Sequence, residues 1–392
     1  MSNERVLVLN AGSSSLKFGV YDAAPEDDGS PTLRGEVKGI GTGTQLRLTH
    51  GSAETRDVLR GDEPDHQSVL KRVLPWLRGT TGGELAAAGH RVVHGGMRFA
   101  QPTRVDDGTL EQLRKLTPLA PGHQPHNLAP IDALRTAFPE MPQIACFDTA
   151  FHRSQPEVAQ RFALPRDYHD AGVRRFGFHG LSYQSIAEQL PAHMNESADG
   201  RVVVAHLGHG ASMAGLHKRR SVATTMGFTA LDGLPMGKRC GTLDPGVILH
   251  LLQETGMSSQ AVSELLHERS GLLGVSGETS DVAQLLRSNS DAAREALELF
   301  TYSAARAVGS LAAALEGLDA LVFTAGIGEN APAIREDIVD RLGWLGIGLD
   351  VASNEACDTR IESVDSVTPV LVLHTDEEAV IARATKHAIA AG

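Results

Sequence analysis

The stretch Val6–Asp22, VLVLNAGSSSLKFGVYD, decides the fold of this 392-residue chain. It starts with the apolar run Val6–Leu9, continues through the small polar turn Asn10–Ser15 and ends in the run Leu16–Tyr21. A short apolar run bounded by turn residues is typical of a buried strand, and the run after the turn is typical of its hairpin partner. Backbone N–H groups and hydroxyls that converge on a tight turn suit a phosphate-like anion. The stretch therefore predicts a hairpin whose turn can hold an anion.

The same pattern returns in the second half of the chain, at Val202–Leu216, VVVAHLGHGASMAGL. In a gapless alignment of the two stretches, Gly12 matches Gly208 and Ser13 matches His209, and four apolar residues precede each turn. A strand–turn–strand unit that occurs twice indicates a duplicated domain. A third glycine turn follows an apolar run at Ala320–Asn330, ALVFTAGIGEN. A GxG sequence after a strand is weak evidence for a nucleotide loop when it stands alone, but as the third such turn in one chain it carries more weight.

The segments between the turns predict further elements. We expect antiparallel strands over 32–57, a strand from 143 that ends in Asp148, and a strand over 369–374. Helical spacing or helix-start signals predict helices over 65–78, 128–138, 183–190, 246–254 and 332–342. We expect a polar loop over 191–200 and a mainly helical region over 258–317, with Ser258 and Thr279 as N-caps. Thr375 with Glu378 fits a capping box for the last helix, which leaves Glu377 as the better functional candidate.

Composition limits the class of protein. A hydrophobic content of 41% and a charged content of 21% are those of an ordinary soluble globular protein, long enough for two or more domains. The net charge of −12 argues against a nucleic-acid binder. Three cysteines without metal-site spacing indicate reduced thiols in a cytoplasmic protein. Because there is neither a signal-peptide pattern nor an apolar run of membrane-spanning length, we expect no membrane association.

Three charged residues lie in predicted strands or between glycines and are candidates for active-site residues. Arg91 lies in the predicted strand of GHRVVHGG, Asp148 ends the strand that starts at 143, and Arg239 lies between glycines in MGKRCGTLDP. Arg91 could instead face solvent at a strand edge, Asp148 could cap a helix, and Arg239 could be a solvated loop charge. The flanking glycines and histidines favour a site, because open α/β sheets place their chemistry at the carboxyl ends of strands.

Three glycine turns, each after a buried strand, in a duplicated chain match the actin-like ATPase and sugar-kinase architecture. Within it, the sequence resembles the acetate kinase family. The strings that carry the resemblance are VLVLNAGSSSLKF (6–18), GHRVVHGG (89–96), LAPGH (119–123), CFDTAFH (146–152), RRFGFHGLS (174–182), VAHLGHGAS (204–212), MGKRCGTLDP (236–245), FTAGIGEN (323–330) and TDEE (375–378). They run from one end of the chain to the other in the family's order, so the resemblance is specific.

The resemblance implies an α/β fold with two duplicated actin-like (ribonuclease H-like) domains and an interdomain nucleotide cleft. The first domain would comprise 1–149 plus 380–392. The second would comprise 150–379 and carry the nucleotide loop and a homodimer interface. The implied reaction is a reversible, direct in-line phosphoryl transfer from ATP to acetate, which gives acetyl phosphate and ADP, with Mg²⁺, or Mn²⁺ in its place, as the metal.

The resemblance also assigns roles to individual positions. The catalytic set is Arg91, Asp148, His179 and Arg239. The acetate-binding set is Arg91, Val93, Gly122, Phe178 and Ala230. The set that faces the nucleotide and its phosphates is Asn10, Ser13, Ser15, Lys17, His123, His206, Leu207, Gly208, His209, Gly210, Asp281, Val282, Ala283, Gly326, Ile327, Gly328 and Asn330. The metal set is Asn10 and Glu377.

Some positions depart from the family's usual pattern, and they leave alternatives open. His209 stands where Asn is usual, Thr242 where Asp is usual, and Ala283 where Arg is frequent. Gly122 replaces a usual Leu and Ala230 a usual Pro near the acyl pocket, so a propionate or butyrate kinase with an enlarged pocket is the alternative. A nucleotide-sensing ATPase on the same architecture is a second alternative, since it would not need its arginines and histidine to converge.

Overall fold

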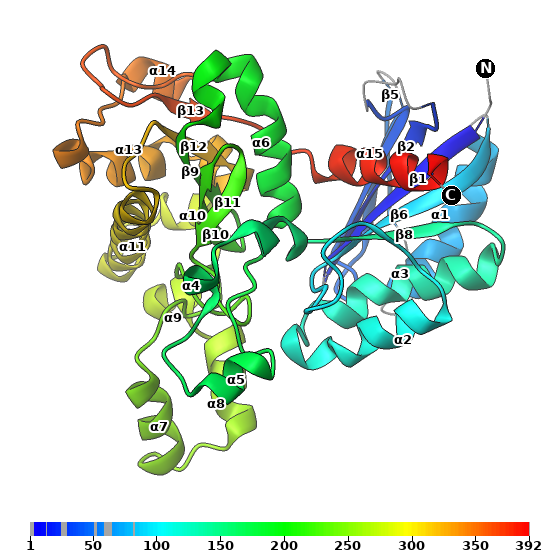
Figure 1. Cartoon of the computed structure of the whole chain (residues 1–392), viewed down its shortest axis with the longest axis horizontal. Helices are drawn as coiled ribbons and strands as arrows, with labels where there is room; N and C mark the ends of the chain where they lie inside the picture. Colours follow the sequence, from blue (N-terminus) through cyan, green and yellow to red (C-terminus); the bar gives the residue numbers. More distant parts are fainter. Residues whose placement is uncertain are drawn as a thin grey trace. The chain divides into compact units, whose positions relative to one another are not determined.

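The computed structural model describes residues 4–12, 14–24, 30–50, 53–58, 65–80 and 83–391, so Ser13 lies outside the described residues. The chain forms two compact units (Figure 1). Unit 1 is Met1–Phe151 with Asp376–Gly392, and unit 2 is His152–Thr375. Relative to the expected ranges, 150–151 and 376–379 therefore belong to unit 1. The start of the last helix belongs there because it is hydrogen-bonded to Asn10.

Unit 1 is built on a mixed sheet. Its described strands run in the order β5-β4-β3-β2-β1-β6-β8-β7. The bounds are β1 Glu4–Ala11, β2 Ser15–Asp22, β3 Leu33–Lys38, β4 Gln45–His50, β5 Ala53–Val58, β6 Glu84–Val92, β7 Thr103–Arg104 and β8 Gln143–Phe147. β1 pairs antiparallel with β2, as the hairpin pattern predicted, and β1, β6 and β8 are parallel neighbours.

Helices cover this sheet, and the last helix of the chain is one of them. They are α1 His66–Thr80, α2 Asp107–Lys115, η1 Thr117–Leu119, α3 Gln124–Ala137 and α15 Glu377–Ala390. Side chains of α1 and α3 pack with Leu7 and Leu9 of β1 in one core. α15 lies along β1 and β6 (Figure 1). A Cβ on Gly89 of β6 would lie 2.6 Å from Ile381 and 2.2 Å from Thr385, so this glycine permits the close approach of α15.

Unit 2 repeats the same sheet topology. Its described strands run in the order β11-β10-β9-β12-β13, with bounds β9 Arg201–Leu207, β10 Ala211–His217, β11 Arg220–Thr224, β12 Ala320–Thr324 and β13 Val370–Val372. β9, β10 and β11 are antiparallel neighbours, and β9, β12 and β13 are parallel ones. The strands β1, β2, β3, β6 and β8 of unit 1 have the same order and directions. The duplication that the sequence predicted is therefore confirmed at the level of topology.

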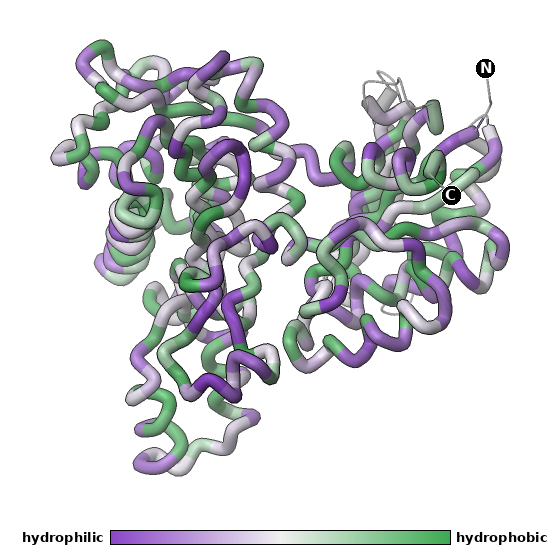
Figure 2. The backbone as a smooth tube through the Cα atoms, viewed as in Figure 1, coloured by the Kyte–Doolittle hydropathy of each residue, from purple (hydrophilic) through white to green (hydrophobic). Residues whose placement is uncertain are grey.

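Unit 2 also contains the following described helices, some of which, such as α7 and α8, lie away from the sheet (Figure 1). They are η2 Ala150–Ser154, which begins at the end of unit 1, α4 Glu157–Gln160, α5 Arg166–Asp170, α6 Gly180–Met194, η3 Asn195–Asp199, α7 Pro245–Gln253, α8 Ser259–Glu268, α9 Gly271–Ser276, α10 Val282–Leu285, α11 Asp291–Leu315, α12 Ala325–Asn330, α13 Pro332–Asp340, η4 Gly343–Leu345 and α14 Val351–Glu355. The long helix α11 carries hydrophobic and hydrophilic residues around its turns (Figure 2), and its buried side includes Phe300 and Val308. Such an amphipathic helix buries one face against the core.

Four local predictions were wrong, each for a physical reason. The expected loop over 191–200 is helical, because the buried face continues from Leu190 to Met194 past Pro191. The expected glycine turn after β12 is the short helix α12, and Ala325 at φ +67° makes the abrupt change of direction. Ser258 caps α8 as predicted, but Asp281, not Thr279, caps the helix α10.

The fourth error concerns the start of α15. Asp376 is the N-cap, and its carboxylate accepts from the Ala379 N–H at 2.9 Å. The Thr375 hydroxyl is buried without a hydrogen bond in the described structure, so no capping box forms with Glu378. Glu378 instead accepts a hydrogen bond from Asn10. Because Glu378 was interpreted as part of a capping box, its carboxylate was not predicted near Asn10.

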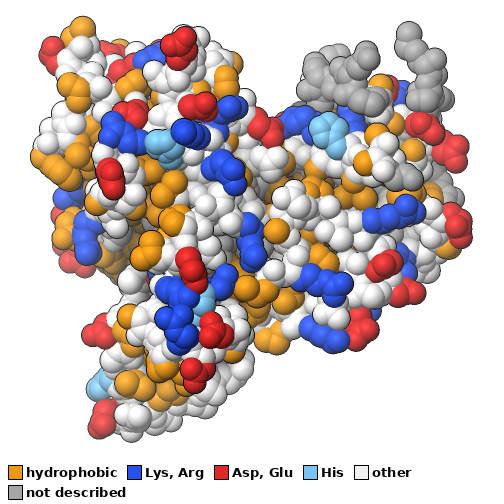
Figure 3. Space-filling model, viewed as in Figure 1, with side chains coloured by type: hydrophobic (Ala, Val, Ile, Leu, Met, Phe, Trp, Pro, Cys, Tyr) orange, Lys and Arg blue, Asp and Glu red, His pale blue; other side chains and the backbone are white. Residues whose placement is uncertain are grey.

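The visible surface of each unit carries charges of both signs. Basic side chains are interspersed with acidic ones on the face shown in Figure 3. None of the described helices is long and apolar enough to cross a membrane.

Candidate active site

The first cluster of candidate residues lies in unit 1, where two parallel strands end side by side. Arg91 is near the end of β6 and is paired in register with Cys146 of β8, while Asp148 follows β8 directly. The Arg91 guanidinium donates to Asp148 from Nη2 at 2.7 Å and from Nε at 3.1 and 3.2 Å. Asp148 is fully buried. The two residues that the sequence singled out separately therefore form one bidentate ion pair.

Asn10, at the end of β1, joins this pair to the start of α15. Its Oδ1 accepts from Arg91 Nη1 at 3.2 Å, and its Nδ2 donates to Glu377 Oε2 at 2.9 Å and to Glu378 Oε1 at 3.0 Å. A guanidinium can only donate and an ionised carboxylate can only accept, so the surroundings fix which end of the amide is oxygen. Asn10 thus orients both carboxylates and the arginine at once.

The charges of this cluster are only partly balanced. Burial disfavours the charge of Arg91, but Asp148 and Glu377 outweigh it and hold the Arg91 pKa above its usual value. Burial raises the pKa of the Asp148 carboxyl, and Arg91 opposes that rise. Burial and the neighbouring Glu377 raise the pKa of Glu378, while Lys17 of β2 and Asn10 lower it. The three carboxylates Asp148, Glu377 and Glu378 outnumber the cations Arg91 and Lys17. The cluster therefore suits a further cation.

The other predicted residues of unit 1 differ in burial. Val93 is buried, and its N–H donates to Asn127 Oδ1 at 2.9 Å. Ser15 begins β2. His123 stands at the N-cap of α3 without a side-chain cap bond, and Gly122 before it is exposed, with open space where a Cβ would point.

The second cluster lies in unit 2, at the start of α6 and the turn between β9 and β10. His179 is the N-cap of α6 with φ +57°. Its Nδ1 lies 2.8 Å from Ser212 Oγ, and its ring stacks on His206 with a centroid separation of 4.2 Å. His206 Nδ1 lies 2.8 Å from Ser182 Oγ. Phe178 is buried and comes directly before His179.

Arg239 reaches the same turn. Its Nη1 donates to the Ala230 carbonyl at 2.6 Å. A Cβ on Gly210 would lie 2.8 Å from Arg239 Nη2 and 3.1 Å from His179 Nε2. Both side-chain nitrogens therefore lie against Gly210, where any larger residue would crowd them. Burial lowers the pKa of Arg239 to about 10, with Glu268 opposing, so the side chain stays cationic at neutral pH.

The two arginines differ in their partners. Arg91 is held by Asp148, whereas Arg239 forms no ion pair among the described residues. A cation without a carboxylate partner, in a small-residue setting, is suited to an external anion such as a phosphoryl group. Arg239 and His179 lie near each other within unit 2, and the expected convergence of Arg91 with both of them stays a prediction.

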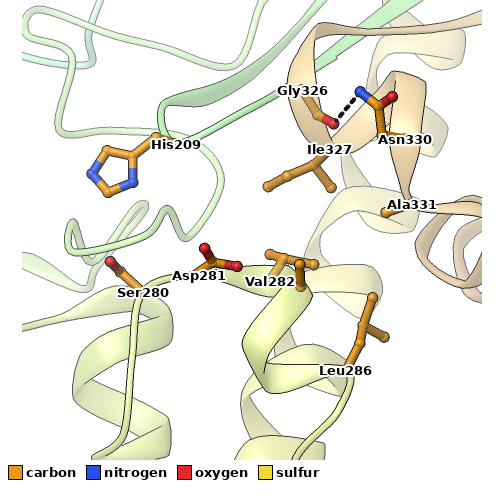
Figure 4. Close-up of a pocket in the computed structure, with 10 residues that line it drawn as sticks. His209, Ser280, Asp281, Val282, Leu286, Gly326, Ile327, Asn330 and Ala331 are labelled. Atoms are coloured by element: carbon orange, nitrogen blue, oxygen red, sulfur yellow. Dashed lines mark hydrogen bonds between the residues drawn. The ribbon is translucent and has the colours of Figure 1, made fainter. Parts of the chain in front are cut away.

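A pocket of about 390 Å³ opens next to this cluster, entirely within unit 2 (Figure 4). Its lining residues are His209, Ser280, Asp281, Val282, Ala283, Leu286, Gly326, Ile327, Asn330 and Ala331. Figure 4 shows Ile327 and Val282 on facing sides and His209 at one end. Asn330 donates to the Gly326 carbonyl at 2.9 Å, across one turn of the helix α12 at the rim.

The lining agrees with most of the nucleotide residues that the resemblance proposed in this unit. Ser280, Leu286 and Ala331 were missed, although Leu286 lies four residues after Val282, on the same helix face. The predicted residues His206, Leu207, Gly208, Gly210 and Gly328 do not line the pocket. Leu207 and Gly328 are buried, and Gly208 donates its N–H to the Gly210 carbonyl at 3.1 Å to close the turn.

Residues 5–383 match the sequence profile of the Acetokinase family. The chain belongs to this family. An acetate kinase of Rhodopseudomonas palustris is 50% identical over 385 residues, which cover 96% of each chain. The expected family is thereby confirmed.

Solved structures of acetokinase-family proteins agree with this assignment. A propionate kinase from Francisella tularensis has a TM-score of 0.90 and 34% identity, and covers 99% of this chain and 100% of its own. An acetate kinase from Porphyromonas gingivalis has a TM-score of 0.86 and 35% identity, and covers 98% of this chain and 100% of its own. The expected actin-like α/β fold class is therefore confirmed along with the family.

Proposed function

We propose that this acetokinase-family protein transfers the terminal phosphoryl group of ATP reversibly to acetate, which gives acetyl phosphate and ADP. The observation that carries the proposal is that Arg239 Nη2 and His179 Nε2 both lie against Gly210. Gly210 directly follows His209, which lines the pocket. Two donors beside a pocket of nucleotide size suit a phosphoryl group at the end of a bound nucleotide.

The pocket residues divide the work of holding the nucleotide. The apolar side chains of Ile327 and Val282 offer facing surfaces for a purine ring. Asp281 already accepts from the Gln284 N–H at 3.1 Å, so its carboxylate is oriented by the helix that it caps. The phosphates would extend past His209 toward Arg239.

Arg91 is the proposed contact for acetate. A guanidinium has five N–H donors. Asp148 takes Nε and one N–H of Nη2, and Asn10 takes one N–H of Nη1. One N–H on each terminal nitrogen is left, which matches the two oxygens of a carboxylate. Buried Val93 is near in sequence and would face the methyl group of acetate.

The reaction would be direct, without a covalent enzyme intermediate. Acetate is ionised at neutral pH, so no strong general base is needed. Asp148 would therefore hold Arg91 in place instead of removing a proton. Arg239 and His179 would stabilise the charge that spreads over the moving phosphoryl oxygens.

The residues of unit 1 fit a magnesium ion held with the nucleotide. Among the described residues no group of three His, Cys, Asp or Glu side chains is placed to hold a metal alone. Mg²⁺ usually keeps several waters and needs only one or two carboxylates besides the phosphates. We expect Glu377 to be the main protein ligand and Asn10, whose Nδ2 donates to Glu377, to orient it. When bound, the metal would neutralise phosphate charge.

We propose Mg²⁺, or Mn²⁺ in its place, as the metal, a cytoplasmic location and a homodimer formed through the second unit. Propionate kinase is the second candidate, since one similar structure carries that name and Gly122 leaves open space where a Cβ would point. If Gly122 and Ala230 enlarge the acyl pocket, propionate will be accepted well.

The test is a hydroxamate assay with ATP, magnesium, hydroxylamine and a panel of acetate, propionate and butyrate. We expect acetyl hydroxamate to form fastest. A higher kcat/KM for propionate would assign the second candidate. ATP binding without any hydroxamate would instead indicate a nucleotide-sensing protein. Arg239→Ala should lower kcat on the order of 10²–10³-fold, and a variant with near-normal turnover would remove Arg239 from its proposed role.

A further inference from the structure

Arg335 of α13 is a buried arginine that the reaction described above does not use. Its side chain is fully buried, and α13 follows directly on α12, the helix at the rim of the pocket. The Arg335 Nη1 donates to the Gly328 carbonyl at 2.8 Å and to the Glu329 carbonyl at 3.1 Å. Both carbonyls belong to the last turn of α12. Arg335 therefore holds the carboxyl end of a helix that lines the pocket.

The sequence explains why this end of α12 takes a donor from a side chain. In an α-helix the carbonyl of residue i accepts from the N–H of residue i+4. Four positions after Gly328 comes Pro332, the first residue of α13, and proline has no N–H. Gly328 is buried, and a buried carbonyl without a donor is unfavourable. Arg335 thus supplies the hydrogen bond that Pro332 cannot.

The other side of the Arg335 guanidinium is bound to the region of α14. Nε donates to Asn354 Oδ1 at 2.8 Å, and Nη2 donates to the Asn354 carbonyl at 2.6 Å and to Cys357 Sγ at 3.3 Å. Asn354 is buried, and its Nδ2 donates to the Pro332 carbonyl at 3.0 Å. The five N–H groups of a guanidinium are therefore all used within the protein. Arg335 links α12 to α14 and does not offer its donors to a ligand.

This link bears on the pocket because α12 supplies part of its lining, namely Gly326, Ile327 and Asn330. Figure 4 shows the Ile327 side chain in the pocket, on the side facing Val282. α12 has only six residues, and so short a helix is not stable in water without neighbours. The position of Ile327 therefore depends on what holds α12 in place.

We propose that Arg335 and Asn354 are positioning residues for the nucleotide, because they hold α12 where Ile327 faces the purine ring. The proposal rests on the proposed function, which puts the nucleotide in this pocket. It adds α14, which lies outside the described lining of the pocket, to the elements that support nucleotide binding. Loss of the link should weaken the binding of ATP and leave the transfer step nearly unchanged.

The first test observes α12 without any nucleotide. Hydrogen–deuterium exchange with mass spectrometry measures how readily the amides of 325–331 open in the whole protein. Arg335→Met removes all five donors, and we expect exchange in 325–331 to become at least about tenfold faster. Arg201→Met is the matched control, because Arg201 donates to the Glu316 carbonyl at the end of α11, away from the pocket. Unchanged exchange of 325–331 in Arg335→Met overturns the proposal.

A milder variant keeps this test decisive if Arg335→Met does not fold. Asn354→Ala leaves the arginine in place and removes one of its acceptors, together with the hydrogen bond to Pro332. We expect exchange in 325–331 to become about threefold faster in this variant. Exchange equal to that of the wild type would overturn the proposal in the same way.

The second test measures the binding of ATP with magnesium by isothermal titration calorimetry. The Kd and the KM for ATP should both rise by about tenfold in Arg335→Met, with kcat at saturating ATP within about threefold of the wild type. Arg335→Lys should lie between the two, because an ammonium group has three N–H donors instead of five. Arg201→Met should bind ATP as the wild type does. A lower kcat with an unchanged KM, or unchanged Kd in both Arg335 variants, overturns the proposal.

A double variant shows whether Arg335 acts through α12. In Ile327→Ala the aligned side chain is already absent, so adding Arg335→Met should raise the Kd for ATP by less than it does in the wild type. A full multiplication of the two losses would mean that Arg335 does not act through Ile327, and it would overturn the proposal. If the wild type binds no ATP, the proposed function fails, and the exchange result still decides whether Arg335 holds α12.

Discussion

Arg91 and Asp148 form a bidentate ion pair across two neighbouring parallel strands, with the shortest N–O distance at 2.7 Å. The carboxylate is fully buried, and the arginine side chain is 17% exposed. The pair keeps a cation at the end of β6 where a carboxylate substrate can reach it. Its fixed geometry matters more than its net stability, since buried ion pairs lose much of their attraction to desolvation.

Asp148→Ala should therefore destabilise unit 1 as well as abolish turnover. Removing Asp148 leaves the largely buried Arg91 with only the longer contact to Glu377 at 3.8 Å and the hydrogen bond to Asn10. Breaking a buried pair costs about 3–5 kcal/mol, and we expect a loss at the lower end of that range. Urea unfolding followed by circular dichroism measures the loss. The control is Asp132→Ala, which breaks the exposed pair with Arg114 and should cost about 0–1 kcal/mol. Equal stability of the two variants would contradict the assigned role of the buried pair.

Asn10→Asp should weaken the apparent affinity for magnesium more than it weakens the binding of ATP alone. The substitution replaces an amide that donates to Glu377 and Glu378 by a third carboxylate beside them. Like charges at hydrogen-bond distance repel, so Glu377 would lose its orientation. We expect the magnesium concentration for half-maximal rate to rise by about tenfold. Glu378→Gln is the matched comparison, because it keeps the shape and removes one charge. An unchanged magnesium curve in Asn10→Asp would remove Asn10 from the metal region.

Much of the fold was predictable because local patterns of apolar and turn residues determine it. The hairpin at Val6–Asp22 and its repeat at Val202–Leu216 each gave apolar runs around a glycine turn, and both are β-hairpins in the structure. What could not be predicted depends on contacts between distant residues. Glu378 fits a capping box by spacing, yet its partner is Asn10, 368 residues away. A contact between residues so far apart in the chain cannot be predicted from the spacing of residues.

The site was predictable in its residue types and much less in its pairings. The sequence singled out Arg91, Asp148 and Arg239 as separate charges. Only the structure shows that one arginine is bound by a carboxylate and the other is not paired among the described residues. Arg335 and Asn354 gave no signal at all, because an arginine and an asparagine in helices are ordinary surface residues until their burial and hydrogen bonds are seen.

His209→Asn should leave nucleotide binding nearly unchanged. Burial, Arg239 and Lys238 lower the pKa of His209 below its usual 6.5, so the imidazole is neutral at pH 7.5. It can then contribute hydrogen bonds but no charge, as asparagine does. We expect the KM for ATP in His209→Asn to stay within about threefold of the wild type. His209→Leu removes every hydrogen bond and should raise the KM by about tenfold, consistent with about 1.4 kcal/mol. A tenfold rise in both variants would mean that a charged His209 binds phosphate.

Glu329 should give the nucleotide loop a stability that depends on pH. Its carboxylate accepts from the Ala325 N–H at 2.8 Å and lies 2.7 Å from His374 Nδ1. Burial alone would raise its pKa, but His374 and the backbone N–H groups of Thr375 and Ala325 outweigh burial and lower it below 4.5. A carboxyl group whose pKa is lowered by folding stabilises the folded state above its unfolded pKa. That stability is lost as the pH falls through the lowered value.

Wild type should therefore exceed Glu329→Gln in stability at pH 7, and the gap should begin to close near pH 4.5 and vanish at lower pH. Thermal unfolding at a series of pH values measures the gap. A gap that stays constant from pH 7 down to pH 3 would show that the ionised carboxylate is not the source of the stability.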